Sequence, residues 1–362
     1  MTVLWQRTRL GPCEAVPDLR RTVPIPTGPD EVGPEWVNAA LSGDGQFKGL
    51  VTGLSVEVFD QATGFFSRLV RLRLSYEETG PGVPSSLVLK LAPTDPLLRS
   101  VGASYHFYER EVGFYRDLAP LGGALNPHCY WCDFDPETND FGILLADVSS
   151  LASEDQLAGV SAGRLSTAAV GVADMHARWW GSAALEEYPW CRPLKAKGVD
   201  ALFERYREVW PIFLDRFSNI LPDGSERFGD AAADAMYGAV EQLSRGPATL
   251  AHGDFKADNL FFEGAPERVV TVDWQNTCRA VGPFDLAVLL AQSTSAEVRR
   301  AHQWDVLRSW HERVLTQVST PYSYRDAVAD YRRSVLFYLV HPVLPAPSTR
   351  RRTPGTGASR RP

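Results

Sequence analysis

The order in which two hydrophobic patterns follow each other along the chain constrains its fold most strongly. Strand-like runs come first, at residues 53–60, 68–76 and 86–93, and the middle run alternates in the manner of a half-buried antiparallel strand. From about residue 161 onward, apolar residues recur instead at the spacing of amphipathic helices. Because strands and helices are segregated along the chain, the sequence predicts an α+β protein of two lobes and not an alternating βαβ array.

Further elements complete this plan and divide the chain into four parts. We expect a short helix over residues 35–41, a longer helix over about 104–119, and strands over about 128–134 and 141–148. The proline-rich start is expected to be extended, and the Pro/Gly/Ser/Thr/Arg-rich end to be disordered. The predicted parts are a lead-in (1–34), a lobe made of an antiparallel sheet with one helix (35–148), a mostly helical lobe (149–344) and a tail (345–362).

The charge balance separates the main part of the chain from its end. Lys and Arg total 37 against 44 Asp and Glu, a net charge of −7, and five arginines without an acid lie among residues 350–362. Residues 1–349 therefore carry about −12, which excludes a polycation that binds nucleic acid through charge alone. No apolar run approaches the length of a membrane span, about 20 residues, and the first residues lack the apolar region of a secretory signal. Five widely spaced cysteines fit reduced thiols, so we expect a cytoplasmic protein with no nucleic-acid or membrane partner.

The segment HGDFKADN, residues 252–259, is the most informative part of the sequence for chemistry. It places four ionisable side chains and an amide between apolar flanks, and such a cluster is costly to bury unless it has partners or a task. Asp273 follows at the end of another apolar run, VVTVDW. Phosphoryl transfer requires an Asp that accepts a hydroxyl proton, together with an Asn and a second Asp that bind Mg²⁺ through hard oxygen ligands. An ordinary polar turn closed by an Asx cap is the alternative interpretation.

HGDFKADN followed by VDWQ resembles the catalytic and metal-binding loops of the aminoglycoside phosphotransferase-like kinases, small-molecule relatives of the protein kinases. Within that group the chain looks most similar to the ecdysteroid-kinase-like (CHK kinase-like) branch, through EVGFYRDL at 111–118, ADMHARWW at 173–180 and the HGDxxxxN…VDWQ spacing. The resemblance covers about residues 35–340. It implies a bilobal protein-kinase-like fold, ATP and Mg²⁺ as cofactors, and phosphorylation of a hydroxyl group on a small-molecule acceptor.

The resemblance also implies a role for each residue of the loop region. Asp254 would be the catalytic base, and Asn259 and Asp273 would hold Mg²⁺. His252 would brace the loop rather than react, and Asp285 would tie the loop down through hydrogen bonds. Because this fold and loop are shared among many substrates, the residues predict phosphotransfer and leave the acceptor unspecified.

The resemblance further implies a lysine in the N-terminal sheet that contacts the nucleotide phosphates, and Lys90 is the candidate. It lies inside the apolar run SLVLKLAP, where a lysine is unfavourable unless its ammonium group has a partner; the alternative is an edge lysine that discourages strand pairing. Two helix glutamates compete as that partner. At about 100° per residue, Glu111 borders the arc of apolar side chains and Glu109 lies on the solvated side, so Glu111 is preferred.

Two features depart from the kinase pattern and motivate a second hypothesis, a pseudokinase-type protein that binds nucleotide or an apolar ligand without phosphotransfer. The expected nucleotide loop offers only Gly64, and Ala146 stands before Asp147 where an acidic pair is usual. The intact residues of the catalytic and metal-binding loops argue against this hypothesis. Protein-kinase activity is a weaker third option, because no APE-like motif follows VDWQ.

Other chemically interesting residues receive structural interpretations. Cys129 and Cys132 form a lone CxxC pair, so we expect strand packing and not a zinc site. His176 lies on an aromatic-rich helix and is expected to be a packing histidine with satisfied hydrogen bonds. Four tryptophans of the C-terminal half are compatible with an apolar acceptor, and packing explains them equally well: Trp179, Trp180, Trp190 and Trp210.

Overall fold

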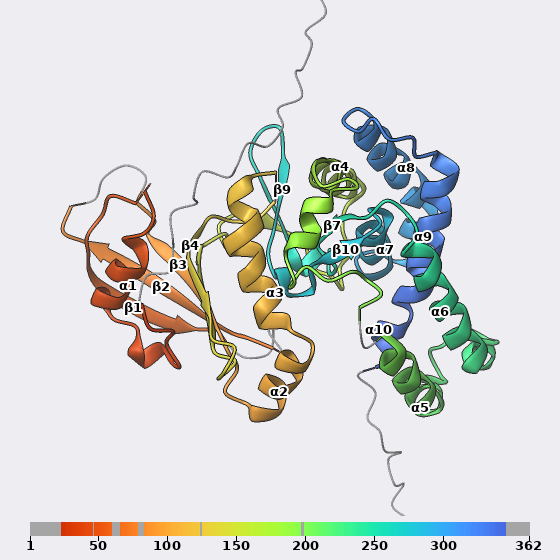
Figure 1. Ribbon diagram of the computed structural model, residues 1–362, viewed down its shortest axis with the longest axis horizontal. Helices are drawn as coiled ribbons and strands as arrows, with labels where there is room; N and C mark the ends of the chain where they lie inside the picture. The colour runs from red at the N-terminus through yellow and green to blue at the C-terminus, as the bar shows by residue number, and fades with distance from the viewer. Residues whose placement is uncertain are drawn as a thin grey trace, which may run out of the picture. The chain divides into compact units, whose positions relative to one another are not determined.

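The computed structural model describes residues 23–45, 47–59, 66–78, 83–123, 125–196 and 199–344. The expected nucleotide loop at Gly64 and the Arg-rich tail lie outside the described residues. The described residues form two compact units, one within residues 1–112 and 127–147 and the other within 113–126 and 148–362. Figure 1 follows them in chain order from red to blue. An antiparallel sheet dominates the first unit and helices dominate the second, so the predicted α+β class is confirmed.

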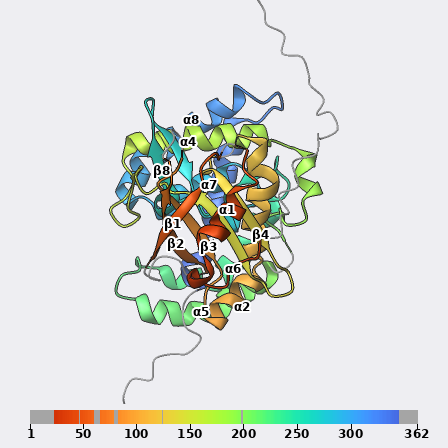
Figure 2. The same cartoon turned by 90° about the vertical axis from the view of Figure 1, so that its left-hand side faces the viewer.

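The first unit is built on a five-stranded antiparallel sheet with the strand order β1-β2-β3-β5-β4; Figures 1 and 2 label β1, β2, β3 and β4. The second strand shows the predicted alternation, because Val70 and Leu72 are fully buried whereas Arg73 is exposed. The elements of this unit are a 3₁₀ turn (Pro29–Glu31), α1 (Pro34–Leu41), β1 (Val51–Val58), β2 (Arg68–Tyr76), β3 (Ser86–Leu91), α2 (Pro96–Ser104), α3 (Phe107–Gly113), β4 (Cys129–Phe134) and β5 (Phe141–Ala146).

Helix α1 covers one face of this sheet. It contacts both edge strands, β1 and β4, and so crosses the sheet from edge to edge (Figure 2). Its Trp36 meets Trp131 of β4 edge to face, with ring centroids 5.1 Å apart. Leu89 and Leu91 of β3 belong to the same apolar cluster as Trp36. Because side chains alternate along a strand, Lys90 between those two leucines points to the opposite face of the sheet.

The helical segment after β3 differs from the expected single helix over residues 104–119. Helix α2 ends at Ser104, where the expected helix was to begin, and α3 starts only at Phe107. His106 separates them with a φ of +58°, a left-handed conformation that no α-helix continues through. The earlier helix begins where Pro96 occupies the first turn and the Asp95 carboxylate accepts hydrogen bonds from backbone amides of that turn. No helix was predicted over residues 96–104, and this proline with its cap is the sequence signal that marks one there.

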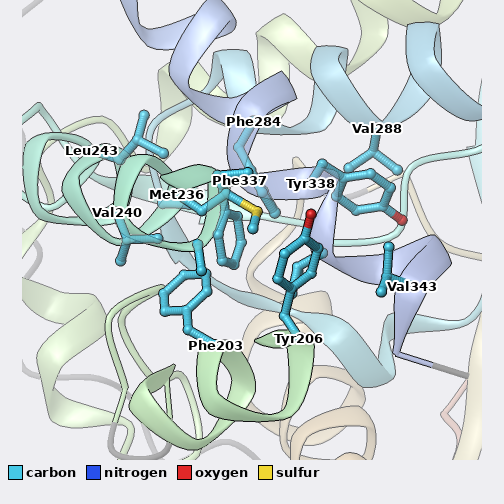
Figure 3. Packing of buried hydrophobic residues seen from close by; sticks show 14 of the residues in the cluster. Phe203, Tyr206, Met236, Val240, Leu243, Phe284, Val288, Phe337, Tyr338 and Val343 are labelled. Carbon is cyan, nitrogen blue, oxygen red and sulfur yellow. The ribbon is translucent and has the colours of Figure 1, made fainter. Parts of the chain in front are cut away.

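The second unit is mostly helical. A described apolar core of this unit lies among α5, α6, α7, α9 and α10, whose side chains interdigitate in Figure 3. The ring of Phe337 lies 6.1 Å from that of Phe203 and 6.0 Å from that of Phe284, so three helices meet at one aromatic side chain. The longer helices of this unit are α4 (Ala162–Arg178), α5 (Val199–Phe217), α6 (Asp230–Leu243), α7 (Pro283–Gln292), α8 (Ala296–Leu315) and α9 (Tyr324–Tyr338). The short helix α10 (Val340–Val343) follows α9.

Short strands and turns interrupt these helices and carry the polar loop. Strand β7 pairs with β10, and β6, β8 and β9 form a three-stranded sheet, all antiparallel. Residues 252–256 therefore connect β7 to the turn before β8, and Asp273 follows β9. Among the described residues, no helix combines the length and apolar composition of a membrane span. The remaining elements are a π-helical turn (Phe114–Leu118), β6 (Ala152–Ser153), β7 (Thr249–Ala251), β8 (Leu260–Glu263), β9 (Arg268–Thr271), β10 (Cys278–Ala280) and 3₁₀ turns (Ala119–Leu121, Ala183–Glu187, Ser225–Phe228, Ala257–Asn259, Trp274–Asn276).

Candidate active site

A buried ion pair lies in the first unit, on the sheet face opposite α1. The ammonium group of Lys90 on β3 lies 2.8 Å from Oε1 and 2.7 Å from Oε2 of Glu111 on α3, and both residues are buried. Glu109, the competing glutamate, has a side chain that is 37% exposed and pairs with His106 at 3.2 Å. A buried charge requires a close partner, and Glu111, one turn into α3, is that partner for Lys90.

In the second unit, the loop after β7 folds around Asp254. This residue is only 8% exposed. Nζ of Lys256 lies 3.0 Å from its Oδ2 atom. Nδ2 of Asn259 donates to the backbone carbonyl of Asp254 at 2.8 Å and to its Oδ2 atom at 3.3 Å. The amide nitrogen of Asn259 makes both of these bonds, so its amide oxygen is the atom that remains to bind a cation.

His252 and Gly253 set the shape of this loop. Gly253 has a φ of +83°, and a Cβ atom there would lie 2.1 Å from the carbonyl oxygen of Asn276. Nδ1 of His252 accepts a hydrogen bond from the Asp254 backbone amide at 3.2 Å, so Nε2 carries the proton and donates to the carbonyl of Val272 at 3.0 Å. Burial lowers the pKa of His252, and the ring is neutral at physiological pH. His252 therefore connects the loop to the end of β9 as a neutral brace.

Asp285, in the first turn of α7, anchors the start of the loop. Its Oδ2 atom accepts the backbone amide of His252 at 2.8 Å, and its Oδ1 atom accepts the backbone amide of Gly253 at 2.9 Å. Nε2 of His176 lies 3.1 Å from the same Oδ2 atom, and Nε1 of Trp310 donates to Nδ1 of His176 at 3.0 Å. Since Nδ1 accepts from the indole, Nε2 of His176 holds the proton that is donated to Asp285.

His176 is thus buried and satisfied, as expected of a packing histidine, but it also orients the anchor of the loop. The sequence contained no signal for its connection to Trp310 and Asp285, because the three residues lie on α4, α8 and α7.

Asp273 adopts a left-handed backbone conformation, with φ 67° and ψ 64°. Such a conformation costs a non-glycine residue about 1 kcal/mol, and Asp and Asn accept it more readily than most. The neighbouring Trp274 is fully buried, its ring centroid 3.7 Å from that of Phe114 and 4.5 Å from that of His252. This packing compensates for the cost and keeps the Asp273 turn beside the loop that carries Asp254.

The carboxylates of Asp254 and Asp273 influence each other. Burial raises the pKa of Asp254, the charge of Lys256 opposes that rise, and the charge of Asp273 adds to it. Among the described residues there is no group of three or more His, Cys, Asp and Glu side chains that could hold a metal ion by themselves. Mg²⁺ prefers oxygen ligands, and it usually takes only one or two from the protein when phosphates and water complete its coordination shell. The side-chain oxygens of Asn259 and Asp273 match such a pair of ligands.

The other residues with a structural interpretation are the cysteine pair and the tryptophans. Cys129 and Cys132 are free and half-buried on β4, on either side of the buried Trp131. Of the four tryptophans, Trp210 stacks on Tyr206 at 5.5 Å and the indole of Trp190 donates to Asp117 at 2.7 Å, so both serve packing.

Comparisons with known proteins connect this geometry to a family. A model of the ecdysteroid kinase-like family matches residues 181–320, which include HGDFKADN and VDWQ, and confirms the predicted resemblance there. A comparison with curated proteins finds no match.

Solved structures of small-molecule kinases are similar to the chain. Choline kinase from Cryptosporidium parvum has 10% identity and a TM-score of 0.52, over 81% of this chain and 84% of that one. Ethanolamine kinase from Plasmodium vivax has 11% identity and a TM-score of 0.49, over 86% and 80%. An aminoglycoside phosphotransferase from Streptomyces rimosus, in complex with ADP and streptomycin, has 18% identity and a TM-score of 0.44, over 76% and 90%. The likeness to choline kinase shows a shared fold and confirms the predicted kinase-like fold class.

Proposed function

We propose that this protein is an ATP-dependent phosphotransferase that phosphorylates a hydroxyl group of a small molecule. The observation that carries the proposal is the loop around Asp254, which places a buried carboxylate beside Asn259 and within the electrostatic influence of Asp273. The ecdysteroid kinase-like match over residues 181–320 and the fold shared with a choline kinase support the same reaction class.

Asp254 would act as the general base. It would accept a hydrogen bond from the acceptor hydroxyl and take its proton as the phosphoryl group is transferred. Burial raises the pKa of Asp254, which makes the carboxylate a stronger base than one in water. The charge of Lys256, 3.0 Å away, opposes that rise and favours the ionised carboxylate.

Asn259 and Asp273 would hold Mg²⁺ on the nucleotide phosphates. Bound there, the ion would neutralise the negative charge that develops on the transferred group. His252 and Asp285 would not react: their hydrogen bonds keep the loop in place, so that Asp254 is positioned before substrate arrives.

Lys90 would contact the nucleotide phosphates, with Glu111 orienting it. The close pair at 2.7–2.8 Å supports this role over that of an edge lysine, because β3 pairs with a strand on each side. We further propose that the sheet unit binds the nucleotide and that the helical unit carries the base and the acceptor.

Phosphoryl transfer from ATP to a panel of alcohols tests the proposal. Asp254→Asn should lower turnover by about a thousandfold, because the general base is lost while the side chain keeps its shape. The matched control is Asp258→Asn: Asp258 is exposed on the same loop, accepts the backbone amide of Gln156 at 2.9 Å, and keeps that acceptor as Asn. Equal turnover in wild type and Asp254→Asn would contradict the proposal. Nucleotide binding without any turnover would instead support the binding-protein alternative.

A further inference from the structure

Trp310 of α8 is connected to the Asp254 loop through two intervening side chains. Its indole Nε1 donates to Nδ1 of His176 at 3.0 Å, and Nε2 of His176 lies 3.1 Å from Oδ2 of Asp285. The Asp285 carboxylate in turn accepts the two backbone amides that begin the loop, immediately before Asp254. Trp310, His176 and Asp285 are all fully buried. A continuous chain of hydrogen bonds therefore runs from α8 to the residue beside the candidate base.

Packing holds the indole of Trp310 in one place. Helix α8 packs against α4, which carries His176 (Figure 1). A Cβ atom on Gly282, the residue before α7, would lie 2.3 Å from Cζ2 of the indole and 2.9 Å from Nδ1 of His176. The rings of Trp180 and Tyr322 also lie near the indole, with centroids 6.2 and 6.3 Å away. The indole N–H therefore has a fixed direction, toward His176.

The indole determines which nitrogen of His176 carries the proton. An indole N–H can only donate, so Nδ1 of His176 must present a lone pair to Trp310. The ring proton then belongs on Nε2, where it is donated to the carboxylate of Asp285. In the other tautomer, lone pairs of His176 Nε2 and Asp285 Oδ2 would face each other at 3.1 Å, and the buried proton on Nδ1 would point at a donor. Trp310 therefore excludes the tautomer that cannot hold Asp285.

The orientation of the Asp285 carboxylate matters because it fixes the start of the loop. Oδ2 accepts the backbone amide of His252 at 2.8 Å as well as the proton of His176, and Oδ1 accepts the backbone amide of Gly253 at 2.9 Å. A carboxylate that loses its side-chain donor can rotate, and its bonds to the two backbone amides then weaken together. Because Asp254 follows these two residues directly, the candidate base moves with them.

We propose that Trp310 is a positioning residue for Asp254, which acts by holding His176 in the tautomer that donates to Asp285. The inference rests on the proposed function, in which Asp254 is the base. A small displacement of a catalytic group from its reacting partner lowers the rate strongly. A buried side chain of α8 therefore affects proton removal without touching the substrate.

Steady-state kinetics of Trp310→Phe test the inference. Phenylalanine keeps an aromatic side chain in the core and removes the indole donor, so kcat should fall by about fivefold or more, while KM for ATP changes by less than about twofold. Trp304→Phe is the matched control, because Trp304 lies on the same helix and packs on Tyr331 with ring centroids 5.9 Å apart. Its kcat should equal that of wild type. A Trp310→Phe variant as fast as an active wild type would overturn the inference.

A second pair of variants tests whether Trp310 acts through His176. His176→Leu removes the donor to Asp285 and should lower kcat at least as much as Trp310→Phe does. The double variant should be no slower than His176→Leu alone, since both changes interrupt one hydrogen-bonded chain. If the two losses multiply in the double variant, Trp310 affects turnover by a separate route and the inference is wrong.

Long-range ¹H–¹⁵N NMR correlations of the histidine rings measure the tautomer without relying on turnover. The resonances of His176 are identified by their absence from the spectrum of His176→Leu. Wild type should show a protonated Nε2 and an unprotonated Nδ1, and Trp310→Phe should shift the Nδ1 resonance. The wild-type spectrum tests the tautomer even where Trp310→Phe folds poorly.

The outcomes separate this inference from the proposed function. A wild type with a protonated Nδ1 on His176, or an Nδ1 resonance that Trp310→Phe leaves unshifted, overturns the inference and leaves the proposed function standing. A wild type that phosphorylates no alcohol overturns the proposed function and the inference with it.

Discussion

The ammonium group of Lys90 lies between the two carboxylate oxygens of Glu111, at 2.8 and 2.7 Å. The two residues come from β3 and α3, and both are buried. A pair of this kind is strongly asymmetric in energy. Keeping it adds little net stability, but removing one member leaves a buried charge without its partner.

Glu111→Ala should therefore lower the free energy of unfolding by about 3 kcal/mol. Glu109→Ala is the matched control: its side chain is 37% exposed, and its removal should change the free energy by no more than about 0.5 kcal/mol. Urea unfolding measures both values. Similar losses for the two variants would show that the Lys90–Glu111 pair has no special energetic role.

Gly253→Ala should destabilise the Asp254 loop. The added Cβ would lie 2.1 Å from the carbonyl oxygen of Asn276, at a φ of +83° that alanine rarely adopts. We expect a loss of more than about 1 kcal/mol in the free energy of unfolding, together with a loss of turnover. Gly238→Ala should have the opposite sign, about 0.5–1 kcal/mol of stabilisation, because this exposed glycine lies inside α6 with nothing within 4 Å of a Cβ atom. Thermal unfolding of the two variants checks both signs; a neutral Gly253→Ala would contradict the steric argument.

Turnover should require Mg²⁺ and should depend on Asp273. Chelation with EDTA is expected to abolish phosphoryl transfer, and added Mg²⁺ to restore it. Asp273→Asn should raise the Mg²⁺ concentration for half-maximal turnover by at least about tenfold, because a neutral amide binds the cation more weakly than a carboxylate. Asparagine tolerates the left-handed backbone at this position, so the variant tests the ligand and not the fold. Undiminished turnover in the presence of EDTA would exclude the proposed metal role.

Stability should decrease as the pH falls below about 6.5, and His341 should account for part of that loss. Burial lowers the pKa of His341 to about 4, and the charge of Lys256 adds to the effect. The unfolded chain then binds a proton near pH 6.5 that the native chain does not bind, so the loss develops between about pH 6.5 and 4.

At pH 5, His341→Gln should therefore lose about 1–2 kcal/mol less than wild type does, relative to pH 7.5. Asp254, whose pKa is raised, contributes to the pH dependence of stability with the opposite sign. That contribution is the same in both proteins and does not affect the difference between them. Urea unfolding at several pH values measures the difference. Above pH 7.5 the two proteins should respond alike, and curves that stay parallel down to pH 5 would contradict the prediction.

Local periodicity made part of the site predictable. The alternation along β3 indicates that Lys90 faces away from Leu89 and Leu91, and helical spacing distinguishes Glu111 from Glu109. Both arguments depend only on backbone geometry, which repeats every two residues in a strand and about every 3.6 in a helix. The break at His106 was not predictable in this way, because a single left-handed residue interrupts a pattern that otherwise stays apolar on one side.

The motif HGDFKADN with its following Asp273 and Asp285 was readable because its residues lie close together in the sequence, and the short strands and α7 that carry them are local structures. The partners of that motif were decided by tertiary structure alone. His176 reaches Asp285 from α4, and Trp310 reaches His176 from α8. A hydrogen bond between distant segments depends on how helices pack, and that packing is set by the whole apolar core. Sequence pattern therefore determined the candidate catalytic groups and the type of fold, whereas the folded chain decided which side chains hold those groups in place.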